Sequence, residues 1–90
     1  MQTFFEATPA QKKIADIGRG MMDFSEEYGK IHGLRRVTDN GLRTLNNLSR
    51  VGHMLTQFGA PWGISQKDLT AEDQKLISQF MNDQVDIERK

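Results

Sequence analysis

The sequence predicts an all-α fold, either a three-helix bundle or a helical hairpin with a third helix packed across it. Apolar residues recur at spacings of three and four within three segments, which is the periodicity of helices with a buried face. Residues that favour turns cluster between these segments. A length of 90 residues fits one domain, residues 1–90, built around a single core.

The first predicted helix spans residues 9–32. Thr8 is a suitable N-cap, Pro9 suits the first turn because its missing N–H is not needed there, and Gly33 is a suitable stop. The apolar residues of this segment are spaced alternately by four and three, which makes a continuous seam. The seam consists of Ala10, Ile14, Ile17, Met21, Phe24, Tyr28 and Ile31.

Small residues form a second line beside this seam, at Gly18, Ser25 and Gly29, with Met22 between them. A glycine inside a helix costs about 1 kcal/mol relative to alanine. Two interpretations remain open. The glycines are tolerated and weaken or kink the helix, or they allow another helix backbone to approach where a side chain would not fit.

The second predicted helix spans about residues 39–58. The run Thr38-Asp39-Asn40-Gly41 offers several capping residues, and Gly59 is a plausible stop. On a helical wheel the apolar residues cover an arc of about 240°, which is too wide for a single neighbour. We therefore expect this helix to be central. Its apolar residues are Leu42, Leu45, Leu48, Val51, Met54, Leu55 and Phe58.

The third predicted helix spans about residues 70–88, after a connection, residues 59–69, that is rich in turn formers. Thr70 is a suitable N-cap, and Glu72 and Asp73 complement the helix dipole in the first turn. The apolar side of this helix contains Leu76, Ile77, Phe80, Met81 and Ile87.

Three aromatic residues lie outside the predicted helices. Trp62 in the long connection either closes the open end of the bundle or anchors the protein in a partner's pocket. Phe4 and Phe5 either fold back on the core or insert into a neighbouring subunit.

Composition excludes several classes of protein. The 12 basic and 12 acidic residues give a net charge of zero, which argues against a strongly basic nucleic-acid-binding arm. The chain has no cysteine, so it has no disulfide and no thiolate metal site. The first residues lack the basic and apolar regions of a secretion signal, and no apolar run is long enough to span a membrane. We expect a cytoplasmic protein without a membrane partner.

The sequence contains no catalytic signature that we can identify. It lacks the Gly-x-Ser-x-Gly motif of hydrolases and the phosphate-binding loop. Gly18-Arg19-Gly20 begins like a dinucleotide fingerprint but has neither the third glycine nor a preceding strand. His32 and His53 lack a metal-binding partner at helical spacing. We expect no cofactor, no metal and no enzymatic activity.

Charge is unevenly distributed along the chain. Residues 29–60 carry a net charge of +4, between flanks of −2 each. Arg36, Arg43 and Arg50 are spaced by seven, so they share a face if the second helix extends back to Arg36. Arginine and amide side chains suit planar acceptors such as carboxylates, phosphates and base edges. The predicted partner-binding residues are Arg35, Arg36, Arg43, Asn46, Asn47, Arg50, His53 and Gln57.

Two other interpretations of these residues remain open. They can be the solvated face of a central helix, or the arginines can pair with the acidic third helix, where residues 70–88 carry a net charge of −4.

The first helix and the central second helix together offer more apolar surface than one short third helix covers, so we expect self-association, most simply as a two-fold dimer. The predicted subunit interface contains Ile14, Ile17, Met21, Phe24 and Tyr28.

The resulting hypothesis is a small helical protein without catalytic activity that binds and modulates a macromolecule. Its partner would be a host or regulatory protein, as for the regulators and inhibitors that phages and mobile elements encode. The alternative is a protein that binds nucleic acid or a nucleotide through the basic and amide residues of the second helix.

Overall fold

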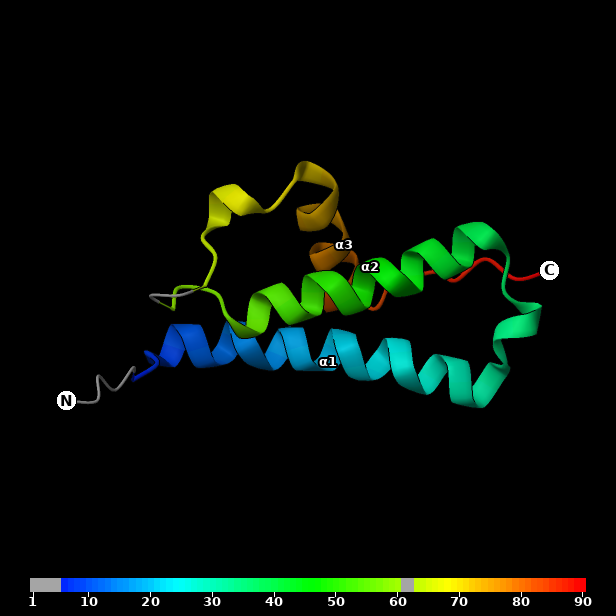
Figure 1. Ribbon diagram of the computed structural model, residues 1–90, viewed down its shortest axis with the longest axis horizontal. Helices are drawn as coiled ribbons and strands as arrows, with labels where there is room; N and C mark the ends of the chain where they lie inside the picture. The colour runs from blue at the N-terminus through cyan, green and yellow to red at the C-terminus, as the bar shows by residue number, and fades with distance from the viewer. Residues whose placement is uncertain (1–5, 61–62) are drawn as a thin grey trace.

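The computed structural model describes residues 6–60 and 63–90 and has the predicted all-α fold. Its helices are α1 (Pro9–His32), α2 (Asp39–Thr56) and α3 (Ala71–Met81), with short 3-10 turns η1 (Leu34–Arg36) and η2 (Gln66–Asp68) between them. Helices α1 and α2 form a long antiparallel hairpin, and the shorter α3 packs across it (Figure 1). Across the described residues, none of the helices has the length and hydropathy needed to cross a bilayer.

Capping residues set the ends of the two helices of the hairpin. The hydroxyl of Thr8 accepts a hydrogen bond from the backbone N–H of Gln11 at 3.1 Å, and the Gln11 side chain accepts one from the Thr8 N–H at 2.8 Å. This reciprocal box starts α1, and Gly33, with φ of 76°, ends it. The predicted bounds 9–32 are confirmed. Thr38 caps α2 through the Gly41 N–H, and α2 ends at Thr56, two residues before the predicted end.

Helices α1 and α2 approach closely where two glycines face each other. A Cβ atom at Gly18 would collide with the carbonyl oxygen of Gly52, and a Cβ atom at Gly52 would collide with that of Gly18. Further along α1, the Ser25 hydroxyl donates a hydrogen bond to the Leu45 carbonyl oxygen at 2.8 Å. Of the two interpretations of the glycines, close approach of a second helix is therefore confirmed at Gly18, whereas a Cβ atom at Gly29 would meet only the Leu34 side chain.

The core lies between α1, α2 and the residues after α3. Met21 and Leu48 have no exposed surface, and four of the five residues predicted as a subunit interface pack partly buried against this core. The interface prediction is wrong for Met21, because its side chain is enclosed within a single chain. Between Ile14 and Tyr28 the seam forms the α1 side of an intramolecular core. The buried hydrophobic residues are Met21, Val37, Leu45, Leu48, Val51, Leu55 and Ile87.

Helix α3 ends at Met81, so the predicted helix 70–88 is wrong beyond that point. Asp83 adopts a left-handed conformation with φ of 54°, which Asp tolerates better than most residues. The Gln84 N–H then donates to the Gln79 carbonyl oxygen at 2.7 Å, which completes a Schellman-type stop. The predictions for Trp62, Phe4 and Phe5 lie outside the described residues.

Residues 82–90, which we call the tail, run back along the hairpin toward η1 (Figure 1). Val37 and Arg89 form an antiparallel bridge, and the tail places Ile87 in the core. Ile87 is therefore buried as its apolar character requires, but from an extended segment instead of a helix.

Candidate partner-binding surface

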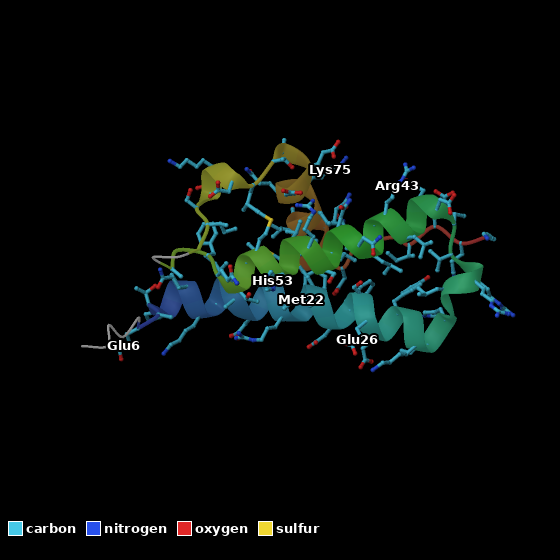
Figure 2. The ribbon with its side chains drawn as sticks, in the orientation of Figure 1. Glu6, Met22, Glu26, Arg43, His53 and Lys75 are labelled. Carbon is cyan, nitrogen blue, oxygen red and sulfur yellow. The ribbon has the colours of Figure 1, made fainter. Side chains whose placement is uncertain are left out.

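Six of the eight predicted partner-binding residues lie along α2. Arg43, Asn46, Asn47, Arg50 and His53 are exposed there, and Gln57, at its end, is half-buried. Figure 2 shows the Arg43 side chain projecting from α2 away from α1. We call these six residues the α2 face.

The other two, Arg35 and Arg36, lie on η1 because α2 begins only at Asp39. The spacing of seven therefore does not place Arg36 on one helical face with Arg43. Arg36 instead lies opposite Lys90, since the Lys90 N–H donates to the Arg36 carbonyl oxygen at 2.8 Å beside the antiparallel bridge. The structure thus separates the predicted residues into the α2 face and a basic end of the hairpin. Sequence reasoning missed the contribution of the tail to that end.

Arg50 joins α2 to α3. Its guanidinium donates to a carboxylate oxygen of Asp73 at 2.8 Å, and the other carboxylate oxygen accepts from the Thr70 N–H at 3.2 Å. The Asp73 side chain is only 6% exposed, whereas that of Arg50 is 52% exposed. Pairing with the acidic third helix, one of the open interpretations, is therefore confirmed for Arg50.

This environment lowers the pKa of Asp73 below its usual value. The largest cause is the hydrogen bond from Arg50, which outweighs the opposing effect of burial, and the Thr70 backbone contributes in the same direction as Arg50. Asp73 is also the third residue of α3 and forms its capping box with Thr70. One carboxylate therefore both starts α3 and attaches it to α2.

Arg50→Ala should reduce the free energy of unfolding by about 1–2 kcal/mol at pH 7, because it leaves the buried Asp73 carboxylate without its strongest partner. Half of the Arg50 side chain is exposed to solvent, which limits the effect. Because the folded pKa of Asp73 is depressed, its stabilisation is present above its unfolded pKa of about 3.9 and is lost as pH falls through the folded value. The difference in free energy of unfolding between wild type and Arg50→Ala should therefore shrink as pH falls from about 3.9 through the folded pKa of Asp73. Urea denaturation at a series of pH values measures this difference.

Arg43→Ala is the control, because it removes the same charge from the same helix at a position without an ion pair among the described residues. Its stability should stay within about 0.5 kcal/mol of wild type at every pH. Equal losses for the two variants would show that the Arg50–Asp73 contact does not hold α3.

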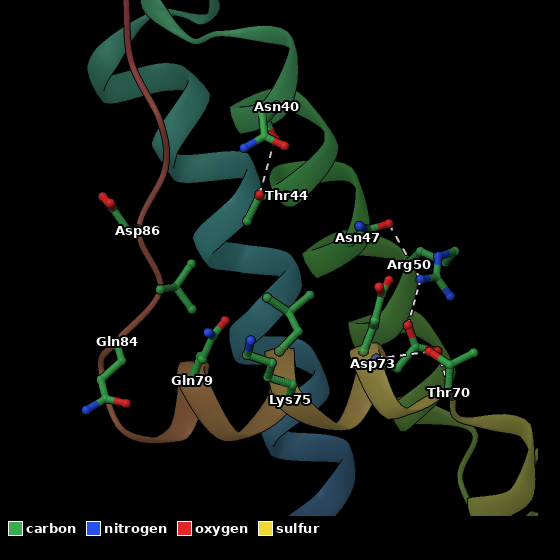
Figure 3. A pocket seen from close by; sticks show the side chains of 13 residues that line it. Asn40, Thr44, Asn47, Arg50, Thr70, Asp73, Lys75, Gln79, Gln84 and Asp86 are labelled. Atoms are coloured by element: carbon green, nitrogen blue, oxygen red, sulfur yellow. Dashed lines mark hydrogen bonds and ion pairs between the residues drawn. The ribbon is translucent and has the colours of Figure 1, made fainter.

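A groove of about 690 Å³ lies beside the α2 face. Figure 3 shows α2 along one side, the tail along the other and α3 across one end. Most of its lining side chains are polar, and none is aromatic. The lining comprises Asn40, Thr44, Asn47, Arg50, Thr70, Glu72, Asp73, Lys75, Leu76, Gln79, Gln84, Val85 and Asp86.

The groove joins the α2 face through Asn47 and Arg50, which belong to both. Sequence reasoning missed its residues from α3 and the tail, including Gln79 and Gln84. The adjacent turn formers Asn82 and Asp83 were the available signal that the third helix stops early and that the chain turns back. Within residues 6–60 and 63–90, no three histidine or carboxylate side chains converge closely enough to hold a metal ion.

Comparisons of the chain with protein-family models, curated proteins and solved structures give no match.

Proposed function

We propose that this chain is a non-enzymatic interaction protein that binds a protein partner through the α2 face and the adjoining groove, and modulates that partner by occupying its surface. The observation that supports this proposal is the continuity of the two features. Exposed arginine and amide groups on α2 lead directly into a groove lined with amides, hydroxyls and charges of both signs. Such mixed polar surfaces match the polar and charged groups of a protein surface.

The charges of the groove favour a protein over the alternative, a nucleic acid. Glu72, Asp73 and Asp86 line the groove beside the α2 face, against the cations Arg50 and Lys75. Phosphate contacts dominate affinity for nucleic acids, and these carboxylates would repel a phosphate backbone. Arg43, in contrast, takes part in no ion pair among the described residues, so a partner carboxylate can reach it.

The double variant Arg43→Ala, Asn46→Ala tests the proposal. Both residues are exposed, and alanine favours the helix, so stability should change by no more than about 1 kcal/mol. A protein that wild type retains in a pull-down should bind the double variant at least about tenfold more weakly, which corresponds to a loss of about 1.4 kcal/mol. Isothermal titration with the purified partner measures this change.

The control is Lys12→Ala, Arg19→Ala, which removes cations from the exposed side of α1. Binding by the control should remain within about twofold of wild type. The control removes two cations and the α2-face variant removes one, so if the control binds as weakly as the α2-face variant or more weakly, overall charge matters and the α2 face has no particular role. A labelled DNA duplex that binds wild type with steep salt dependence, while no protein is retained, would replace the proposal with nucleic-acid binding.

A further inference from the structure

We propose that the groove binds an extended peptide segment of the partner, which pairs through its backbone with the tail. This inference rests on the proposed function, since it names the part of the partner that occupies the groove. It combines the unpaired backbone of the tail, the chemistry of the groove walls and the way in which the tail is held.

The tail offers backbone groups that the rest of the described chain does not use. Near η1 the Thr38 N–H donates to the Glu88 carbonyl oxygen at 3.1 Å, and Lys90 pairs with Arg36. Before that point, Val85, which is half-buried, and Asp86, which is exposed, form no backbone–backbone hydrogen bond with any described residue. Val85 and Asp86 also line the groove. Unpaired main-chain groups beside a groove are the feature to which a peptide strand can add by main-chain hydrogen bonds.

The tail is anchored at both ends of this unpaired stretch. Before it, the Gln84 N–H is bonded to the Gln79 carbonyl oxygen at 2.7 Å. After it, Ile87 is buried in the core, and the Glu88 carboxylate accepts a hydrogen bond from the Asn40 amide at 2.9 Å. A peptide would therefore meet an edge that is already ordered, which reduces the entropy cost of pairing.

The groove walls suit a polypeptide better than a sugar or a base. The amides of Asn47, Gln79 and Gln84 each carry a donor and an acceptor, as a peptide group does, and all three side chains line the same space (Figure 3). Leu76 and Val85 add apolar lining that can accept an apolar side chain of the peptide. Because no aromatic side chain lines the groove, it has no surface on which a base would stack.

The test uses a phage-displayed library of random 12-residue peptides selected on the full chain. Gln79→Trp places a bulky side chain in the groove, and Gln74→Trp makes the same exchange at an exposed position of α3 outside the groove lining. For peptides selected on wild type, the Kd for Gln79→Trp should be at least about tenfold higher than for wild type. The Kd for Gln74→Trp should stay within about twofold of the wild-type value. Bound peptide should also slow amide hydrogen exchange at Val85 and Asp86. If Gln79→Trp fails to fold, Thr44→Trp fills the groove from α2.

Three results would overturn the inference: no peptide is selected, the selected peptides bind the filled variant as well as wild type, or the bound peptide is helical by NMR. The proposed function is distinguished by the partner protein itself. If Arg43→Ala, Asn46→Ala abolishes partner binding and Gln79→Trp does not, the α2 face binds the partner and the groove does not receive it. If groove-specific peptides are selected but the α2-face variant leaves partner binding unchanged, the groove binds peptides and the proposed role of the α2 face is wrong.

Discussion

Gly18→Leu is expected to unfold the chain or to reduce the free energy of unfolding by more than about 3 kcal/mol. Even a single Cβ atom at this position would collide with the Gly52 carbonyl oxygen and would lie 2.9 Å from the Leu55 Cβ atom. Backbone atoms cannot move aside as the end of a flexible side chain can, so α1 and α2 would have to separate. Overpacking typically costs about 1–3 kcal/mol, and leucine adds three more carbons where the two helix backbones face each other. Urea denaturation followed by circular dichroism measures the loss.

Gly20→Ala is a control that adds a Cβ atom two residues away on the same helix. A Cβ atom there would lie 3.2 Å from the edge of the Phe80 ring, which can shift. Alanine is also favoured over glycine by about 1 kcal/mol inside a helix, so this variant should be as stable as wild type or slightly more stable. A Gly18→Leu protein that unfolds at the same urea concentration as Gly20→Ala would contradict the close backbone approach.

Features encoded by local sequence were predictable. The bounds of α1 follow from Thr8, Pro9 and Gly33, each of which acts through the backbone of its own turn. The outward position of Arg43 follows from the helical periodicity of its neighbours. Such features need no knowledge of the rest of the fold.

Features that depend on contacts between distant segments were not predictable in the same way. Ile87 follows Phe80 by seven residues, which fits a helical stripe, and its apolar character requires burial whether the backbone is helical or extended. The left-handed Asp83 marks where the chain leaves the helix, whereas the return of the tail along α2 depends on contacts with distant residues such as Thr38 and Asn40. The groove depends on that return, because its walls come from α2, α3 and the tail.

The same reasoning explains why the neighbour of Met21 was assigned incorrectly. A stripe of apolar residues shows that something must bury it but does not identify the neighbour. The line of small residues beside the seam indicated a close neighbour, and Gly52 on α2 is the residue that meets Gly18 within the same chain. One chain therefore covers much of the surface that would otherwise require a second copy.

Met21→Asp tests this intramolecular assignment. Met21 has no exposed surface, so aspartate there would lose the burial of a large apolar side chain and place a carboxylate among apolar residues without a partner. We expect a loss of more than about 4 kcal/mol, enough to unfold a domain of this size at neutral pH. Circular dichroism should show loss of helix, and dynamic light scattering should show no species with the small radius of a folded monomer.

Ile31→Asp is the control, because Ile31 belongs to the same sequence-predicted seam but is 70% exposed. Its stability should stay within about 1 kcal/mol of wild type, since little apolar surface is removed from the core. If Met21→Asp instead yields a stable, folded monomer from a wild type that is dimeric, Met21 packs against a second subunit and the enclosed core is wrong. If the two aspartate variants unfold at the same urea concentration, burial within the hairpin does not distinguish their positions. A large difference in free energy of unfolding between the two variants would show that the hairpin buries the seam at Met21 and leaves it exposed at Ile31.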